Sequence, residues 1–480
     1  MKPELLMPAG DMEKLKTAFM YGADAVYAGV PVFSLRAREN KFNINSVKEA
    51  VDYAKSLNKK IYLTLNIFPH NYKIPALKKA LRPLADLKPD AFIVADPGVV
   101  MLCQEIAPEI PIHLSVQANN VNWASAKFWH KTGVERIILS REISLTEIKE
   151  IHEKNPGLEL EFFVHGSICI AYSGRCLLSS YFSYRDGNQG TCSHTCRWEY
   201  KVYKAHGKDE VAEKICTTHQ TPIQNHFQKT AEHAPLTAEI GTSCVAKESN
   251  ISSNYKKLDG DYYLEEMQRP GKFFSIDEDE HGTYIMNSRD LCLIEYLKEL
   301  KEAGICSFKV EGRNKTAYYA ASVARIYRKA IDELEEGKPF NPEYLKELAK
   351  TSNRGFIPGF LMNNPSEKAQ DYEKNISHQT HEFVGVIRAI QEKNGHKLYE
   401  MEVKGRVDAP EKIEIITPKN QYETTIKSFK TMDGKEVLTI HPGQKDHVLL
   451  DLEGLTNVTN QPGTDIGVGT ILRKERKVIQ

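Results

Sequence analysis

No apolar run in this 480-residue chain approaches the roughly 20 residues that a membrane-spanning helix needs. The N-terminus, MKPELLMPAGD, has neither a basic region nor a long apolar core, so we expect no signal peptide. Lysine plus arginine total 64, as do aspartate plus glutamate, so the chain carries no global basic field that would attract nucleic acid. We therefore expect a cytoplasmic protein with reduced thiols, in which any RNA partner requires a local basic patch.

Three signatures of known chemistry are missing as well. The chain has no H-E-x-x-H motif of a zinc protease and no G-x-S-x-G motif of a serine hydrolase. No G-x-G-x-x-G follows the first predicted strand, which argues against a dinucleotide-binding sheet. An apparatus for proteolysis is therefore not visible in the sequence.

Short apolar segments alternate with amphipathic helical ones. Strands that are apolar nearly throughout, with helices between them, indicate a parallel sheet covered on both faces. Eight such units predict an α/β fold, a TIM-like (βα)8 barrel, with a long insertion before the last strand. An open doubly wound sheet is the alternative. The predicted strands are residues 4–10, 24–30, 60–68, 90–98, 112–120, 136–144, 158–166 and 306–312.

The domain organisation follows from where this alternation stops. We predict a barrel over residues 1–340, with a cysteine-rich insertion at about 167–287 and a helix over 288–303. Within the insertion, the polar stretch 205–260 is interpreted as a surface excursion. Residues 341–375 are expected to form a helical linker. Residues 376–480 contain short strands with turns between them, and predict a small C-terminal antiparallel β-barrel domain.

Four of the nine cysteines lie in one 28-residue stretch after the seventh strand, with the spacing C-x6-C-x15-C-x3-C. In a chain without signs of secretion, such a cluster indicates a metal site more than disulfides. Buried structural thiols and a thiol nucleophile beside His165 or His194 are alternatives. The spacing favours an iron–sulfur cluster over zinc, which usually requires closer cysteine pairs. The four are Cys169, Cys176, Cys192 and Cys196.

Chemistry in a parallel barrel lies at the C-terminal ends of the strands. Arg141 and Arg313 follow two of these ends and can bind carboxylates in bidentate fashion. The alternative is that Arg–Glu pairs tie the rim of the barrel together. Further candidates for substrate binding at strand ends are Asn66, Gln117 and Asn119, and candidates for proton transfer are His165, Glu142 and Glu311.

The run E-F-F-V-H-G-S-I-C-I-A-Y-S-G-R-C-L-L-S at 161–179 resembles the signature of the collagenase-like peptidase family U32. The resemblance extends to ELLMPAGD, YGADAVYAG, HLSVQANNVN and SFKVEGRNK, and covers at least residues 1–340. The stretches NQGTCSHTCRWEY and EDEHGTYIMNSRDL and the C-terminal β-domain are most similar to the branch of this family that modifies tRNA.

That resemblance implies oxygen-independent hydroxylation of the wobble uridine of tRNA to 5-hydroxyuridine, with prephenate as co-substrate. It also implies a 4Fe–4S cluster held by Cys169, Cys176, Cys192 and Cys196. For the fourth ligand, Cys216, Cys244 and Cys292 are rivals. The segment RWEYKVYK (197–204) can contact RNA by stacking and charge, or form an ordinary amphipathic strand. The alternatives to a hydroxylase are a peptidase and a non-catalytic scaffold that binds a cluster or substrate.

Overall fold

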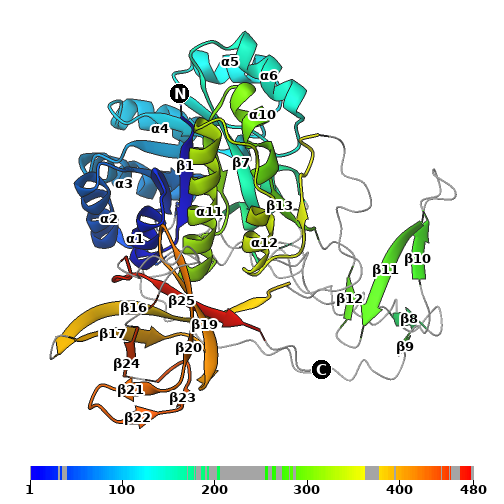
Figure 1. The fold of residues 1–480 in the computed structure, drawn as a ribbon. Helices are drawn as coiled ribbons and strands as arrows, with labels where there is room; N and C mark the ends of the chain where they lie inside the picture. The colour runs from blue at the N-terminus through cyan, green and yellow to red at the C-terminus, as the bar shows by residue number, and fades with distance from the viewer. Residues whose placement is uncertain are drawn as a thin grey trace. The chain divides into compact units, whose positions relative to one another are not determined.

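The computed structural model describes residues 2–30, 33–34, 41–169, 171–177, 179, 185–189, 192–193 and 288–362. It also describes residues 378–393, 396–444, 446–452, 455 and 465–476, and five short strands between residues 203 and 284. The chain divides into two units, residues 1–196 with 286–480, and residues 197–285 (Figure 1).

Eight parallel strands close into a barrel. They pair in chain order from β1 to β7, β14 pairs with β1, and the pairing of β14 with β7 completes the circle (Figure 1). This confirms the predicted TIM-like barrel, in which the last strand comes after a long insertion. The strands are β1 (Glu4–Ala9), β2 (Ala25–Gly29), β3 (Lys60–Leu65), β4 (Ala91–Val94), β5 (Ile112–Leu114), β6 (Arg136–Ile138), β7 (Glu159–Ser167) and β14 (Ile305–Val310).

Helices cover the outside of the barrel and begin at polar caps. The side chains of Asp11, Asn43, Asp96, Asn122 and Ser144 each accept a backbone N–H in the first turn of a helix, which satisfies a donor that has no partner within the helix. The helices are α1 (Met12–Met20), α2 (Ile44–Ser56), α3 (Ile74–Asp86), α4 (Pro97–Ile106), α5 (Trp123–Lys131), α6 (Leu145–Lys154), α10 (Leu297–Glu302) and α11 (Ala317–Glu335).

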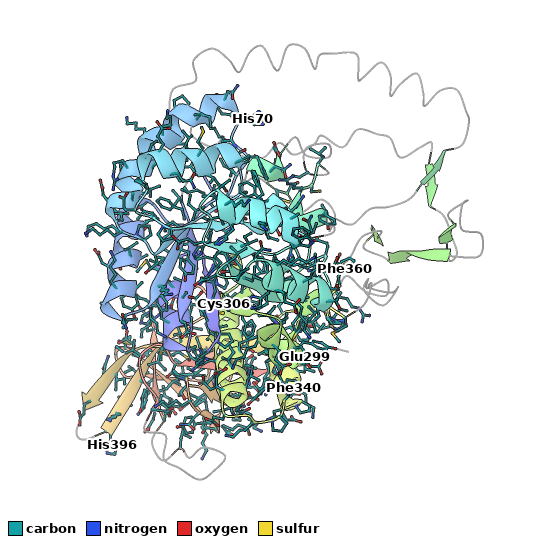
Figure 2. The ribbon with its side chains drawn as sticks, turned by 90° about the horizontal axis from the view of Figure 1, so that it is seen from above. His70, Glu299, Cys306, Phe340, Phe360 and His396 are labelled. Atoms are coloured by element: carbon teal, nitrogen blue, oxygen red, sulfur yellow. The ribbon has the colours of Figure 1, made fainter. Side chains whose placement is uncertain are left out.

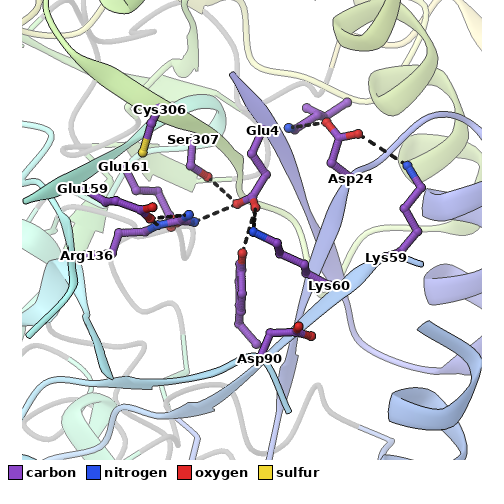
Figure 3. A network of polar contacts seen from close by, with 12 residues as sticks. Glu4, Asp24, Lys59, Lys60, Asp90, Arg136, Glu159, Glu161, Cys306 and Ser307 are labelled. Atoms are coloured by element: carbon purple, nitrogen blue, oxygen red, sulfur yellow. Dashed lines mark hydrogen bonds and ion pairs between the residues drawn. The ribbon is translucent and has the colours of Figure 1, made fainter. Parts of the chain in front are cut away.

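Apolar side chains fill the layer between the strands and the helices, whereas the inside of the barrel is polar. Arg136 Nη1 lies 2.7 Å from Glu4 Oε1 and 3.2 Å from Glu161 Oε2, and Tyr62 and Ser307 both donate to Glu4. Figure 3 shows Arg136, Glu161 and Ser307 gathered around Glu4, which is the first residue of β1. Burial of these charges is tolerated because each has a partner of opposite charge.

The predicted helix over 288–303 is wrong in its first half. Residues Asp290–Cys292 form strand β13, which pairs antiparallel with β7 and parallel with β15 (Phe356–Ile357). A short 3-10 helix (Ile294–Tyr296) leads from β13 into α10. Pairing with β7 and the ion pair between Asp290 and Arg354 are long-range contacts, and they override the local helical pattern.

The C-terminal region forms a separate antiparallel sheet with its own hydrophobic core, as predicted. It is a half-barrel in which β16 and β17 form the longest pair. In sheet order the strands are β20 (Gln421–Ile426), β19 (Glu411–Ile416), β25 (Ile471–Glu475), β16 (His381–Lys393), β17 (His396–Val403), β24 (Val448–Asp451), β21 (Phe429–Thr431) and β22 (Glu436–Val437). A two-stranded sheet joins β18 (Val407–Asp408) to β23 (Thr439–Ile440).

Polar contacts join this sheet to the barrel and to the linker helix. The Tyr21 hydroxyl donates to the carbonyl of Ile416 over 2.7 Å. Arg388 pairs with Glu13 of α1. Arg473, which is 1% exposed, pairs with a glutamate of α12 (Glu343–Ala349), the helix that lies in the predicted linker. The β-domain therefore meets the barrel and the linker helix through specific hydrogen bonds and ion pairs, of which the Tyr21 bond is buried and the Arg388 pair is partly exposed.

The second unit contains the two-stranded sheet β8 (Tyr203–Ala205) with β9 (Tyr255–Lys257). A three-stranded sheet contains β10 (Tyr262–Glu265), β11 (Phe273–Asp279) and β12 (Gly282–Tyr284). Most of the predicted surface excursion lies outside the described residues. Of the segment 197–204, only the last two residues are described, and they belong to strand β8. Among the described helices, none combines the length and apolarity that crossing a bilayer requires.

Candidate active site at the barrel mouth

Cys169, Cys176 and Cys192 lie on a segment that returns to the C-terminal ends of the barrel strands, which we call the mouth. The described residues within 168–193, which we call the cysteine segment, contact the chain after three of the strands. The carbonyl of Asn188 accepts the N–H of Phe68 after β3, over 3.3 Å. The Arg175 Nε donates to the carbonyl of Gln117 after β5, over 2.8 Å. The third contact is made by Glu142, after β6.

Glu142 holds a tight turn of the cysteine segment. Its carboxylate accepts the N–H of Ser173 and the hydroxyl of Ser140, each over 2.7 Å. Ser173 is fully buried and has a φ of +48°, a conformation that non-glycine residues rarely adopt. The turn, Tyr172–Gly174, lies between Cys169 and Cys176. Glu142, predicted as a candidate for proton transfer, is thus placed where it positions the segment that carries the thiols.

Three of the four predicted ligands, Cys169, Cys176 and Cys192, are described, and all three are partly exposed. A side chain on Gly187 would lie 3.6 Å from Cys192 Cβ and 3.7 Å from the carbonyl oxygen of Cys176, so these two cysteines flank the same glycine. Among the described residues, no three His, Cys, Asp or Glu side chains converge as a metal site. Cys196 lies outside the described residues. The donor set, partly exposed thiols on one segment, fits an iron–sulfur cluster in kind.

The rival ligand Cys292 has a different environment. It is 5% exposed, and its Sγ lies 3.8 Å from the Tyr327 hydroxyl. Burial raises the pKa of this thiol to about 11, which disfavours the thiolate that binds metals. The other rivals, Cys216 and Cys244, lie outside the described residues.

His165 lies in the packing between β7, α11 and β15. Its ring is 2% exposed and contacts the rings of Tyr319, Tyr327 and Phe356, with centroids 5.4–6.0 Å away. Its Nδ1 lies 3.4 Å from the Tyr327 hydroxyl. Burial lowers the pKa of His165 to about 4, so the ring is neutral at physiological pH. The pairing register of β7 and β14 shifts next to His165, and this shift accompanies the orientation of the His165 ring towards the helix layer.

Arg313 is buried at the mouth beside Tyr27. Its Nη1 donates to the hydroxyls of Ser34, over 2.7 Å, and Thr64, over 3.1 Å, and its guanidinium lies 5.5 Å from the Tyr27 ring centroid. The Tyr27 hydroxyl lies 3.2 Å from Glu311 Oε2. Burial, followed by the charge of Glu311, raises the pKa of Tyr27, so this hydroxyl stays protonated.

The remaining predicted binding residues follow β3, β5 and β6. Asn66 Nδ2 donates to Ser115 over 3.3 Å. Arg141 donates to the carbonyl of Ser167 over 3.0 Å, and its guanidinium lies 5.1 Å from the Phe163 ring centroid. Gln117 Oε1 and Asn119 Oδ1 are buried without a hydrogen-bond partner among the described residues. Polar groups available to a ligand therefore do occur at these strand ends.

Sequence reasoning missed Lys309, the buried cation beneath the mouth. Its Nζ lies 2.6 Å from Glu161 Oε1 and 4.3 Å from the Tyr27 ring centroid. Burial lowers the pKa of Lys309, and Glu161 opposes that shift. The signal was present in the strand ICSFKVEG, where Ser307, Lys309 and Glu311 alternate and therefore face the inside of the barrel.

The closed parallel barrel, with a cysteine segment at its polar strand ends, places this chain among the TIM-like α/β barrels. The model of peptidase family U32 matches residues 10–371, and that of the U32 C-terminal domain matches residues 379–459. The chain therefore belongs to peptidase family U32.

Relatives are similar over nearly the whole chain. It is 43% identical to tRNA hydroxylation protein P of Escherichia coli (strain K12), over 92% of either chain. It is 42% identical to tRNA hydroxylation protein P of Haemophilus influenzae, over 89% of this chain and 88% of the relative. An uncharacterized protease of Methanocaldococcus jannaschii is 34% identical over 78% of this chain and 76% of the relative.

Proposed function

We propose that this protein acts in tRNA hydroxylation. The observation that carries the proposal is the 43% identity to a tRNA hydroxylation protein over 92% of both chains, which includes the barrel, the cysteine segment and the C-terminal domain. In its finer form, the reaction converts the wobble uridine to 5-hydroxyuridine and consumes prephenate. A base inside a stem–loop must leave its stack to reach a buried site. In this proposal the base enters the barrel at the mouth.

The mouth suits a dicarboxylate such as prephenate. Arg313 offers a guanidinium held by two hydroxyls, whereas the deeper Lys309 is already paired with Glu161. Charge-assisted bonds of this kind are about twice as strong as neutral ones and orient a planar carboxylate. In this proposal Arg313 binds and orients the acid, and the protonated Tyr27 hydroxyl keeps Glu311 in place.

Cys169, Cys176, Cys192 and Cys196 would hold a 4Fe–4S cluster in the same proposal. Such a cluster supplies one-electron transfer when bound. The protein's own contribution is geometric, because the cysteine segment is held against rigid strand ends. It is held by Glu142, by Gln117 and by the residues that follow β3. Iron and sulfide analysis of anaerobically purified protein tests this, with Cys169→Ala compared with Cys306→Ala. Cys306 is a barrel thiol that donates to a strand carbonyl and has its pKa raised to about 11 by burial. Equal iron in both variants would contradict the proposal.

The activity itself is tested with tRNA that lacks the modification. Anaerobic protein, prephenate and tRNA are incubated, and 5-hydroxyuridine is measured by mass spectrometry of the digested nucleosides. We expect product only when prephenate is present, and a large loss in Arg313→Met but not in the control Arg406→Met, an exposed arginine of the C-terminal domain. No product under these conditions refutes the proposal. Product only after a cell fraction is added supports the scaffold alternative, and residue-dependent cleavage of casein supports the peptidase alternative.

A further inference from the structure

An aromatic and basic cluster lies on the loop between β3 and α3, beside the cysteine segment. The Tyr72 side chain is 74% exposed. The ring of His70, labelled in Figure 2, lies 6.0 Å from the Tyr72 ring centroid, with 31° between their planes. Lys73 Nζ lies 5.9 Å from the centroid of the same ring. Two exposed rings with an ammonium group beside them form an amphipathic surface rather than a scattered apolar residue.

The backbone holds this cluster in a fixed place. Residues Asn71–Lys73 form a 3-10 turn that runs directly into α3, and the N–H of Lys73 donates to the carbonyl of His70 over 2.8 Å. Phe68, four residues before Tyr72, is bonded to the cysteine segment through Asn188 and lies under the guanidinium of Arg175, 4.7 Å from its ring centroid. The cluster therefore lies close to the place where the cysteine segment is bonded to the end of β3.

The charge of this region is positive although the whole chain is neutral. Residues 61–81 contain Lys73, Lys78 and Lys79 and no aspartate or glutamate. Lys78 and Lys79 are exposed on the first turns of α3. Burial lowers the pKa of Lys73, and Asp186 of the cysteine segment opposes that shift, which places Lys73 close to this segment. A local basic patch is what an RNA partner requires in a chain without a global basic field.

We propose that His70, Tyr72 and Lys73 form a stacking platform for single-stranded nucleotides of the tRNA anticodon loop next to the target base. Proteins that bind unpaired RNA combine aromatic rings, on which bases stack, with cations that follow the phosphates. The platform lies where the nucleotide next to a base in the mouth would pass. The lysines of α3 lie beyond the platform, where they can contact the phosphates of the anticodon loop. The inference rests on the proposed function and deepens it by naming the surface that recognises the RNA.

The test is the binding of a fluorescein-labelled anticodon stem–loop to the full-length, anaerobically purified protein, measured by anisotropy. We expect Tyr72→Ala to weaken binding about 5- to 100-fold, the range that loss of one base–aromatic stack gives. Tyr72→Phe keeps the ring and is expected to bind within about twofold of the wild type. Phe128→Ala, which removes a 58% exposed aromatic residue from α5, serves as the control and should bind as the wild type does.

A second measurement separates stacking from charge. Lys79→Ala should reduce the slope of log affinity against log salt by about 0.7, the value for one phosphate contact on a single strand, whereas Tyr72→Ala should leave that slope unchanged. Equal affinity of Tyr72→Ala and wild type overturns the platform and leaves the proposed function standing, provided that the wild type makes 5-hydroxyuridine. A wild type that binds no tRNA and makes no product overturns the proposed function itself.

Discussion

Replacement of Glu161 by glutamine should destabilise the barrel strongly, because this carboxylate neutralises a lysine in the barrel interior. Glu161 is fully buried, and its oxygens lie 2.6 Å from Lys309 Nζ and 3.2 Å from Arg136 Nη1. Glutamine keeps the volume and removes the charge. Arg136 would still have Glu4 and Glu159, each 2.7 Å away, but Lys309 would lose its only ion-pair partner within 4 Å among the described residues.

The expected loss follows from the cost of an unpaired buried charge. Breaking a buried ion pair by removing one partner costs about 3–5 kcal/mol. In the variant Lys309 can reduce that cost by losing its proton, and burial already lowers its pKa in the wild type. The unfolded chain then binds more protons than the folded one, so the free energy of unfolding of Glu161→Gln should rise with pH towards the lysine pKa of the unfolded chain, about 10.4.

Urea unfolding followed by tryptophan fluorescence measures this loss, because Trp123 and Trp129 both lie on α5 of the barrel. Asp52→Asn is the matched control. It breaks the pair of Asp52 with Lys48, also 2.6 Å long but 59–64% exposed, and such pairs contribute about 0–1 kcal/mol.

The double variant Glu161→Gln/Lys309→Met should recover more than half of the lost stability, because it leaves no unpaired lysine. A loss in Glu161→Gln no larger than that in Asp52→Asn would refute the reasoning. A loss that does not shrink as the pH rises would refute it as well.

Three other predictions concern the junctions of the fold. Tyr21→Phe leaves the buried carbonyl of Ile416 without its donor, and should cost about 1–3 kcal/mol and expose the C-terminal domain to limited proteolysis. Gly22→Ala should lower the melting temperature, because Gly22 has a φ of +111° and an added Cβ would lie 2.5 Å from Arg328 Cγ. Burial raises the pKa of Glu414, but its hydrogen bonds and neighbouring cations dominate and lower it. Glu414 therefore contributes stability that is lost as the pH falls below about 4.3, and Glu414→Gln should flatten the acid-unfolding curve.

The barrel could be predicted from the sequence because the strand signal is local and repeated. Continuous apolar runs alternate with helices, and Gly22 and Gly133 end two of those helices with positive φ, as such positions require. The prediction of a helix over 288–303 was wrong in its first half because the deciding contacts are not local. Its apolar spacing is helical, but residues 290–292 gain more from pairing with β7, and no local pattern reports a partner more than 120 residues away.

The candidate site was only partly predictable. Reading polar residues at strand ends identified Arg313, Gln117 and Glu142, and the structure places all three at the mouth. The sequence did not distinguish the roles of these residues, because each role depends on which side chain contacts the cysteine segment. His165 shows a second limit, since a shift of register decides whether a strand residue faces the barrel interior or the helices.

The charges inside the barrel are paired at different depths. At the N-terminal end Arg136 meets three carboxylates, Glu4, Glu159 and Glu161, so its charge is fully compensated there (Figure 3). One layer nearer the mouth, Lys309 shares Glu161 with that arginine. Higher still, Arg313 donates to neutral hydroxyls. At this level the charge of Glu311 also acts on Lys309 and on Tyr27, so cations and carboxylates alternate along the barrel interior up to the mouth. Because Arg136 and Lys309 each have a carboxylate within ion-pair distance, their burial inside the barrel is tolerated.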